Sequence, residues 1–500
     1  MRTFRDVIDA KVAAHPDATC IVAPEPATIL TYADLQRTGA ALAAYGAREG
    51  IPPGAVVSFM LPNGIAAASV FLGAMYAGYV VSPVNLLAQD GQLEYTLDHS
   101  RTRLVFAAHE HCHRLRALLQ RAQGAAVVHA TDPDRLELGE PGAAPLSELA
   151  PDSPAMLMYT SGTTGEPKGV LLTHANMIGA GQVVAAAQEL TASDRVLSAL
   201  PLYHINGQCI ATVSPIVSGG SIVMPHRFSA SQWWSLVERY HPTWLNVVPT
   251  IIAYLLNGPD LTPAQAAACR AIRFARSASA PLPFEQHAAF EARFGIAILE
   301  AMGLTETASV AFANPLEASR RKVGSIGLPL GVEARIVAAA GAVLGAGEQG
   351  EIQVRGENVM AEYYRAPALA AQVRSADGWL ATGDLGYRDG DGYYFVVGRR
   401  KELIIKGGEN IAPREIDEAL LRHPAVLEAA AVGIPDPNYG QDILACVVLK
   451  PGARCDEAEL HAHCLAQLGR YKSPRLLRVV AALPKGPSGK VQRLKLLELQ

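Results

Sequence analysis

Short apolar runs alternate with helix-length segments from the N-terminus to Met302. The runs AVVSFML, TRLVFAA and AAVVHA are followed by RVLSALP, GSIVMP, WLNVVP and FGIAILEAM, and stretches such as DLQRTGAALAAYGAREG have the length and composition of helices. This alternation is typical of α/β domains, in which largely parallel strands are buried on both faces by helices. We therefore predict a large N-terminal α/β domain with parallel sheets.

A different pattern begins near Val323. Short strand-like segments with glycine and aspartate at tight turns, including GYRDGDGYYFVVGRR, predict a small β-rich lobe. After GRRKE the chain returns to helix and strand patterns, with a helix at PREIDEALLRHP and strands at EAAAVGI and ILACVVLK. The 500 residues also exceed what one hydrophobic core usually organises. We predict an N-terminal domain at 1–399 and a small C-terminal α/β domain at 400–500.

Charge and composition argue against several classes of protein. The net charge is −4, the pI is about 6.4 and the arginines are scattered, which does not favour nucleic acid as a partner. No apolar run approaches the ~20 residues that span a bilayer, and the N-terminus lacks a signal peptide's apolar stretch. Seven cysteines without paired short spacing suggest reduced, buried thiols. We predict a cytoplasmic monomer or homodimer that binds neither nucleic acid nor membrane.

The segment at 160–169, TSGTTGEPKG, stands between two apolar runs. Its glycines allow close wrapping of the backbone, its amides and hydroxyls can donate to phosphate oxygens, and its lysine adds positive charge. An ordinary surface loop also favours Gly, Ser and Thr, whereas a P-loop requires Gly-x-x-x-x-Gly-Lys-Ser/Thr, which is absent here. We predict a polyphosphate-binding loop with contacts from Thr160, Ser161, Gly162, Thr163, Thr164 and Lys168.

This loop resembles the phosphate-binding signature of the adenylate-forming superfamily, which comprises acyl-CoA synthetases, luciferases and nonribosomal adenylation domains. Further segments similar to that family's motifs follow in order: PLYH at 201–204, GLTE at 303–306, TGD at 382–384, GRRKE at 398–402 and PSGKVQR at 487–493. The resemblance implies a mobile, hinged C-terminal domain. It also implies an ATP-dependent carboxylic acid:CoA ligase that forms an acyl-adenylate and releases AMP and pyrophosphate.

The resemblance assigns the chemistry to a few residues. Lys490 is expected to stabilise the charge that develops as the acid attacks the α-phosphate. Glu306 offers Mg²⁺ a hard oxygen ligand, with Thr160 as a second candidate ligand and Thr305 beside the phosphates. His204 is expected in the acyl pocket, where it would orient the acid and gate the approach of the thiol, although a core histidine with a satisfied hydrogen bond is the alternative.

Nucleotide contacts follow from the same resemblance. Asp384 and Arg399 can bind the ribose hydroxyls, with a turn aspartate and a surface arginine as the structural alternatives. The segment Ala301, Met302 and Gly303 is expected against adenine. Family members usually carry an aromatic residue in place of Met302, but a thioether can also cover the ring.

The remaining family positions concern the second half-reaction. Members of the family rotate the C-terminal domain between adenylation and thioester formation, and Lys401 corresponds to the pivot. Gly407 and Gly408 resemble the loop that lines the pantetheine tunnel, where glycine allows the backbone to approach a thin ligand. ATP, Mg²⁺ and coenzyme A are the expected cofactors.

The identity of the acid is less constrained. The segments RFARSASA and EAMGLTE resemble those of oxalyl-CoA synthetases and related small-acid ligases. Arg276 lies where a positive charge could meet the second anionic group of a diacid or sulfonated acid, and an internal salt bridge is the alternative. His226 and Arg227 are another candidate anion contact. We predict a short anionic acid of the oxalate, malonate or sulfoacetate type.

Two other functions stay open. The same fold could load an acid onto a carrier protein, although INGQCIATV lacks the aspartate that amino-acid-activating domains tend to use for the substrate amine. A non-catalytic nucleotide-binding regulator is the third hypothesis, and the presence of Lys490, Glu306 and Asp384 argues against it.

Overall fold

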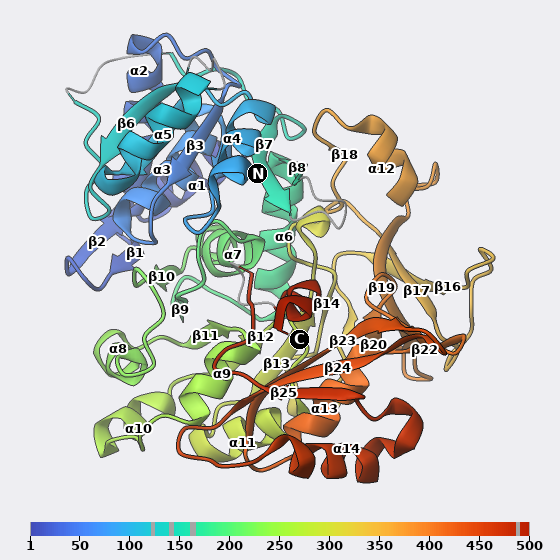
Figure 1. The fold of residues 1–500 in the computed structure, drawn as a ribbon. Helices are drawn as coiled ribbons and strands as arrows, with labels where there is room; N and C mark the ends of the chain where they lie inside the picture. Colours follow the sequence, from blue (N-terminus) through green and yellow to red (C-terminus); the bar gives the residue numbers. More distant parts are fainter. Residues whose placement is uncertain (1, 122–125, 140–144, 161–166, 487–490, 500) are drawn as a thin grey trace.

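The protein was analysed as a computed structural model that describes residues 2–121, 126–139, 145–160, 167–486 and 491–499. Two large sheets with their helices form the first part of the molecule, shown from blue to yellow in Figure 1. A smaller β-rich lobe and a C-terminal unit follow. The predicted α/β fold, with parallel sheets and a β-rich lobe, is confirmed.

The first large sheet has the strand order β15-β14-β13-β12-β11-β9-β10-β1-β2. Neighbours from β1 to β13 are parallel, and β2, β14 and β15 pair antiparallel at the edges. The central strands are buried on both faces, as their unbroken apolar runs predicted. The strands are β1 (Thr19–Ala23), β2 (Thr28–Thr31), β9 (Arg195–Leu197), β10 (Ser221–Val223), β11 (Trp244–Val247), β12 (Phe274–Ser277), β13 (Ile298–Met302), β14 (Phe312–Ala313) and β15 (Leu328–Pro329).

The second large sheet has the order β18-β8-β7-β4-β3-β5-β6. Strands β3 to β7 pair in parallel, whereas β8 pairs antiparallel with both β7 and β18. The predicted phosphate loop therefore connects two neighbouring antiparallel strands. The strands are β3 (Val56–Met60), β4 (Val80–Pro83), β5 (Leu104–Ala108), β6 (Val127–Thr131), β7 (Pro154–Thr160), β8 (Lys168–Thr173) and β18 (Glu362–Tyr363).

Helix α3 (Ile65–Ala77) lies between the two large sheets. It contacts β1 and β2 of the first sheet and β3 and β4 of the second, and all 13 of its residues are buried. A helix that is apolar on every side requires burial on every side, so α3 joins both sheets into one hydrophobic core.

The other described helices pack against the sheets or against one another. They are α1 (Phe4–Ala14), α2 (Tyr32–Arg48), α4 (Asp90–His99), α5 (His109–Arg121), α6 (His174–Ala187), α7 (Ser214–Ser218), α8 (Trp233–Tyr240), α9 (Pro249–Leu256), α10 (Pro263–Cys269), α11 (Phe284–Phe294), α12 (Pro367–Val373), α13 (Pro413–Leu421) and α14 (Glu457–Lys472). Short helical segments are η1 (Asn206–Val213), η2 (Thr305–Thr307), η3 (Ala318–Arg320) and η4 (Arg493–Leu499). No helix in the described part of the chain is long and apolar enough to cross a membrane.

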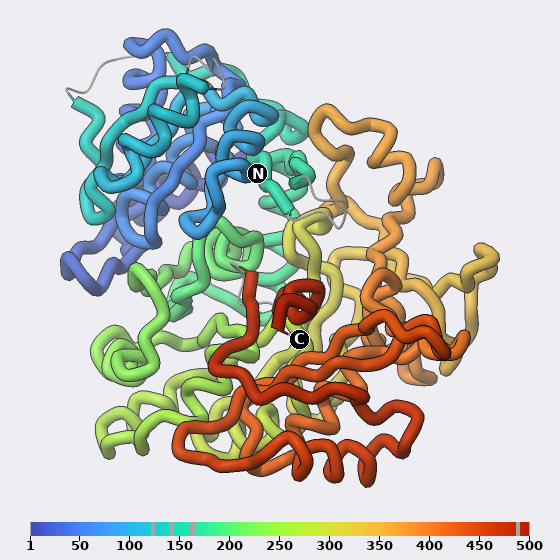
Figure 2. The backbone as a smooth tube through the Cα atoms, in the orientation of Figure 1, coloured from blue at the N-terminus to red at the C-terminus, as the bar shows by residue number. Residues whose placement is uncertain are grey.

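The β-rich lobe is an antiparallel sheet of order β16-β17-β19-β20, and the next sheet along the chain has β22-β21-β24-β23 with β25 beside β24. Figure 2 shows the red C-terminal unit against the yellow-green part of the chain and beside the orange lobe. The strands are β16 (Glu333–Val337), β17 (Gly350–Arg355), β19 (Leu380–Arg388), β20 (Tyr394–Arg399), β21 (Ile404–Lys406), β22 (Glu409–Ile411), β23 (Val426–Asp436), β24 (Gly440–Leu449) and β25 (Leu476–Val479).

Within the described part of the chain, two ion pairs join the C-terminal unit to the rest of the molecule. Arg422 Nε lies 3.5 Å from Glu285 Oε1 of α11, and Arg400 Nη1 lies 3.5 Å from Glu351 Oε2 of β17. The Arg400 and Arg422 side chains are both exposed. The contact with Glu285 therefore lies at the surface.

Because α3 fills the space between the sheets, Phe71→Ala should lower the free energy of unfolding by about 3–5 kcal/mol. Phe71 has no exposed surface. Phe284→Ala is the matched control, because Phe284 is 62% exposed and should change stability by less than about 0.5 kcal/mol. Urea denaturation followed by tryptophan fluorescence measures both, and similar losses would contradict the assigned core.

Candidate active site

The ends of β7 and β8 fix the predicted phosphate loop. Thr160 and Lys168 are opposite each other in the last pair of this antiparallel ladder. Ser161, Gly162, Thr163 and Thr164 of the predicted loop lie outside the described residues. The ammonium of Lys168 lies 5.5 Å from the centroid of the Tyr363 ring, a favourable cation–π contact.

Tyr363 connects the lysine of the loop to Glu306. Strand β18 places Tyr363 opposite Val170 of β8, and the Tyr363 hydroxyl donates a 2.8 Å hydrogen bond to Glu306 Oε1. Burial, together with the neighbouring Glu306 carboxylate, raises the pKa of Tyr363, so its hydroxyl remains a donor at neutral pH. Sequence analysis missed Tyr363, for which the aromatic pair in AEYY was the only signal.

A tight turn after β13 positions Glu306 and Thr305. A Cβ on Gly303 would lie 2.1 Å from the carbonyl carbon of Ser309, so this approach of two backbone segments requires glycine. Ala308 and Ser309 then have positive φ values of 49° and 69°. Such conformations are costly for residues other than glycine and persist where the surroundings hold them. The turn therefore gives Glu306 a defined place beyond the carboxyl end of β13.

The predicted adenine segment forms the end of β13 itself. Ala301 pairs with Ala313 and Met302 with Phe312 of β14. Ala301 is buried and Met302 is half-buried. Met302 is therefore the more accessible of the two side chains.

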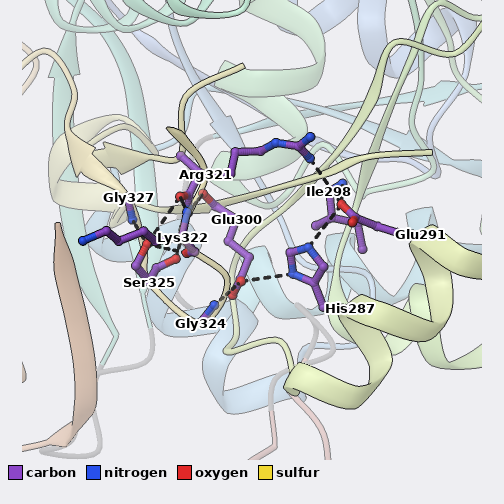
Figure 3. A network of polar contacts seen from close by, with 10 residues as sticks. His287, Glu291, Ile298, Glu300, Arg321, Lys322, Gly324, Ser325 and Gly327 are labelled. Carbon is purple, nitrogen blue, oxygen red and sulfur yellow. Dashed lines mark hydrogen bonds and ion pairs between the residues drawn. The ribbon is translucent and has the colours of Figure 1, made fainter. Parts of the chain in front are cut away.

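A buried polar network supports β13 from its other face (Figure 3). The His287 ring of α11 lies between two carboxylates, with Nδ1 at 3.2 Å from Glu300 Oε1 and Nε2 at 3.3 Å from Glu291 Oε1. The amide of Gly324 donates to Glu300 at 2.8 Å, and Arg321 donates to Glu291 at 3.2 Å. These bonds tie the strand before the adenine segment to α11 and to the chain that precedes β15.

Asp384 and Arg399 face each other across β19 and β20. Arg399 Nε donates to Asp384 Oδ1 at 2.9 Å. Burial alone would lower the pKa of Arg399, but the carboxylates of Asp384, Glu402 and Glu306 raise it above its ordinary value. The predicted ribose pair therefore lies within electrostatic reach of the predicted metal ligand.

His204 precedes η1, a π-helix that begins at Asn206. Its ring lies 5.0 Å from the ring of Tyr203, and its carbonyl accepts the amide of Gln208 at 3.1 Å. A Cβ at Gly207 would lie 2.5 Å from the Pro201 carbonyl oxygen, so η1 packs directly on the segment after β9. π-Helical turns are rare and frequently occur at functional sites.

Arg276 lies in the middle of the first large sheet, on β12. Its side chain has no exposed surface, and Nε, Nη1 and Nη2 form no hydrogen bond with any described residue. Among the described residues no carboxylate pairs with it, so the alternative of an internal salt bridge is not found there. Burial lowers the pKa of the guanidinium to about 10, which leaves it charged at neutral pH.

The other candidate anion contact includes His226, which lies beside two carboxylates. His226 Nε2 lies 2.7 Å from Asp134 Oδ1, and the His226 amide donates to Glu25 at 2.9 Å. With two carboxylates beside it, His226 is a poor site for a substrate anion, and we do not include Arg227 or His226 in the candidate site.

The C-terminal unit carries the remaining predicted residues. Lys490 lies outside the described residues, and its neighbour Val491 forms a bridge with Lys485. Arg493, also in the PSGKVQR segment, contacts Glu402 at 3.2 Å. Gly407 and Gly408 stand between β21 and β22. Lys401 is exposed and lies between β20 and β21.

Two hollows on the surface of the described residues lie away from the candidate site. One surface hollow of 540 Å³ is lined by Asp90 and Arg114 among others, and another of 360 Å³ by Arg374 and its neighbours. Neither is lined by a predicted site residue. The assignment of the candidate site is based on the side chains that the strands bring together.

Residues 8–364 match the AMP-binding enzyme family, and residues 415–490 match the AMP-binding enzyme C-terminal domain. The chain belongs to the AMP-binding enzyme family. It is 54% identical to a sulfoacetate–CoA ligase from Cupriavidus necator, over 99% of this chain and 97% of that protein. It is 35% identical to an oxalate–CoA ligase from Arabidopsis thaliana, over 89% of this chain and 88% of that one.

Among solved structures, ATP-bound MatB from Rhodopseudomonas palustris matches with a TM-score of 0.90 and 30% identity over 99% of both chains. Apo MatB from the same organism matches with a TM-score of 0.78. The structure of this chain therefore resembles ATP-bound MatB more closely than apo MatB.

Membership settles the class of reaction that the motifs predicted. The chain is an acid–thiol ligase of the acyl-CoA synthetase type, with ATP and CoA as its co-substrates. The hypothesis of a non-catalytic regulator is therefore wrong, and the comparisons do not favour loading of a carrier protein.

Tyr363→Phe should weaken the use of ATP, because it removes the hydroxyl that orients Glu306. A hydrogen bond to a charged group contributes about 1.5–3 kcal/mol, so kcat/KM for ATP should fall by about tenfold or more. Tyr364→Phe is the matched control, since the Tyr364 hydroxyl makes no hydrogen bond to a described residue. Steady-state release of pyrophosphate measures both variants. Equal kinetics for the two would contradict a role for the Tyr363 hydroxyl.

Proposed function

We propose that this ligase joins CoA to a short acid that carries a second anionic group, with sulfoacetate as the preferred substrate. The identity to the Cupriavidus necator sulfoacetate–CoA ligase, which extends over nearly the whole chain, supports this substrate. The observation that carries the proposal is Arg276, a fully buried guanidinium whose three nitrogens have no hydrogen-bond partner in the described part of the chain.

A buried charge without a partner is strongly unfavourable, by several kcal/mol even after relaxation. Phosphate-like and carboxylate groups are the natural partners of guanidinium, which can donate to two of their oxygens at once. A sulfonate presents the same kind of oxygens. Binding of a second anion beside Arg276 would therefore satisfy the guanidinium and select for dianionic acids.

The other residues of the proposed site serve the reaction common to the family. His204 would orient the carboxylate that reacts, while Lys490 would stabilise the charge at the α-phosphate. Asp384 and Arg399 would hold the ribose, and Met302 would cover the adenine together with Ala301 and Gly303. These roles do not depend on the group attached to the reacting carboxylate, so they do not by themselves select the substrate.

Magnesium fits the residues around Glu306. Tyr363 occupies Oε1, and Oε2 makes no hydrogen bond to a described residue, which leaves a carboxylate oxygen for a hard cation. Thr160 is the second proposed ligand, with Thr305 and Lys168 beside the phosphates. When bound, the ion would neutralise charge on the phosphate oxygens.

We place the domain boundary between residues 399 and 400, with Lys401 as the pivot. The change from one sheet to the next between β20 and β21 supports this boundary. Rotation about Lys401 would bring Gly407 and Gly408 to the pantetheine of CoA after Lys490 has served adenylation. We also propose a cytoplasmic location for the enzyme.

Arg276→Met tests the preference for a second anion. We expect kcat/KM for sulfoacetate to fall by at least about 100-fold, because two charge-assisted hydrogen bonds are lost. Methylsulfonylacetate, in which a methyl group replaces one sulfonate oxygen, has nearly the same shape without the second charge, and its kcat/KM should change little. Release of AMP in the presence of ATP, Mg²⁺ and CoA measures both.

The same variant has a second, independent consequence. In the absence of acid, Arg276→Met should raise the free energy of unfolding by about 1–4 kcal/mol, since it replaces an unpaired buried charge with an apolar side chain. Differential scanning calorimetry provides this comparison. An equal loss of activity with both acids would remove Arg276 from the acid site.

Lys490→Ala separates the two half-reactions. Adenylate formation should fall below detection, because the variant lacks the charge at the α-phosphate, whereas conversion of a supplied acyl-adenylate to the thioester should persist. Lys401→Pro should show the opposite pattern, with thioester formation impaired most. Pyrophosphate exchange and single-turnover thioester formation measure the two steps. Equal loss of both steps in either variant would contradict the proposed division.

A further inference from the structure

Asn246 is a buried polar residue in an otherwise apolar strand, WLNVVP. It has no exposed surface and is the register partner of Arg276 in the parallel pair β11–β12. Register partners on neighbouring strands project to the same face of a sheet. Two residues earlier, Trp244 and Phe274 lie on that face and stack with ring centroids 5.5 Å apart. Asn246 and Arg276 are therefore neighbours on the inner face.

A chain of hydrogen bonds runs from Asn246 toward the surface. Asn246 Nδ2 donates to Asn206 Oδ1 at 3.1 Å, and Asn206 Nδ2 donates to Ser279 Oγ at 3.2 Å. Asn206 is buried at the start of η1, whereas Ser279 is exposed after β12. Ser279 also has a φ of 73°, a costly conformation for serine that functional sites often retain.

Asn246, at the inner end of this chain, has one polar atom left over. Its Oδ1 is buried and bonds to no described residue, and it lies in the same layer as the Arg276 nitrogens, which likewise have no described partner. An amide oxygen and an amide nitrogen have nearly the same shape, and a hydroxyl can donate or accept. Rotation of both amides by 180° therefore keeps every bond of the chain. In that direction Ser279 donates to Asn206, Asn206 donates to Asn246, and the Asn246 amide group offers an N–H where its oxygen stood.

We propose that Asn246 is a specificity-determining residue that donates to the second anionic group of the acid beside Arg276, with Asn206 and Ser279 as the residues that position its amide. The inference rests on the proposed preference for dianionic acids. A bound anion favours the orientation of the two amides in which each member of the hydrogen-bond chain donates toward the anion. In that orientation the Asn246 amide group gains a partner at the inner end of the chain. Because Asn246 is neutral, it adds selectivity without competing with the anion for the Arg276 guanidinium.

The neutrality of Asn246 is central to this role. An aspartate at this position would have almost the same shape and would supply Arg276 with an internal counterion. The second anionic group of the substrate would then face a guanidinium that the new carboxylate has already neutralised, and that carboxylate would repel it. Asn246→Asp therefore changes the electrostatics of the acid site while preserving its volume.

Asn246→Asp should lower kcat/KM for sulfoacetate by at least about 100-fold, while that for methylsulfonylacetate falls by less than about fivefold. In the absence of acid its Tm should exceed that of the wild type, since a buried charge gains a partner. Asn257→Asp is the matched control, because Asn257 is exposed at the end of α9 and undergoes the same change in charge. It should retain the wild-type preference between the two acids.

Ser279→Ala tests the positioning part. Removal of the hydroxyl should raise KM for sulfoacetate by about three- to tenfold with little change in kcat, and leave both constants for methylsulfonylacetate unchanged. A merely structural role would affect the two acids alike. Ser279 is exposed, so this variant decides the question if Asn246→Asp does not fold.

The outcomes separate this inference from the proposed function. Loss of sulfoacetate preference in Arg276→Met, together with an unchanged preference in Asn246→Asp, would overturn the role of Asn246 and leave the dianionic substrate standing. An unchanged preference in both variants would overturn both proposals. Loss of preference in both, with the expected increase in Tm, supports them together.

Discussion

Parallel pairing of β9, β11, β12 and β13 brings the carboxyl ends of four strands to one edge of the first large sheet. Ligands of open α/β sheets bind beyond that edge. The segment after β9 carries His204 and leads into η1, β12 carries Arg276, and β13 leads into Gly303 and Glu306. Strand pairing alone therefore gathers residues that are about 100 positions apart in the sequence.

The inner and outer faces of β12 and β13 have different roles. Leu299, the register partner of Arg276, belongs to the main core on the inner face, whereas the next residue, Glu300, points to α11 and bonds to His287. Glu300, His287 and Glu291 all have partners in the outer network, so it stabilises the strand. On the inner face no described residue pairs with the Arg276 guanidinium, and our proposal assigns that guanidinium to the substrate.

The sequence predicted the fold class, and its motifs lie at or near strand ends: Thr160 ends β7, Lys168 begins β8 and Arg399 ends β20, opposite Asp384 within β19. The roles of these residues stay predictions. The sequence shows Arg276 as a charged residue in a strand. Whether Arg276 has a partner depends on the side chains of the neighbouring strands, and these are known only from the structure. Asn206 and Asn246 were missed for the same reason. The polar residues of INGQCIATV and the asparagine of WLNVVP were the signal. The register of β11 with β12 connects Asn246 to Arg276, and a hydrogen bond connects Asn206 to Asn246.

The contacts between the C-terminal unit and the rest of the molecule have a thermodynamic consequence. The described ion pairs across the proposed boundary, Arg422–Glu285 and Arg400–Glu351, each involve an exposed arginine. Exposed ion pairs contribute about 0–1 kcal/mol each, so breaking them costs little. The rotation that we propose about Lys401 would therefore lose little free energy from these two ion pairs, and a few additional contacts with ATP or CoA would offset that loss.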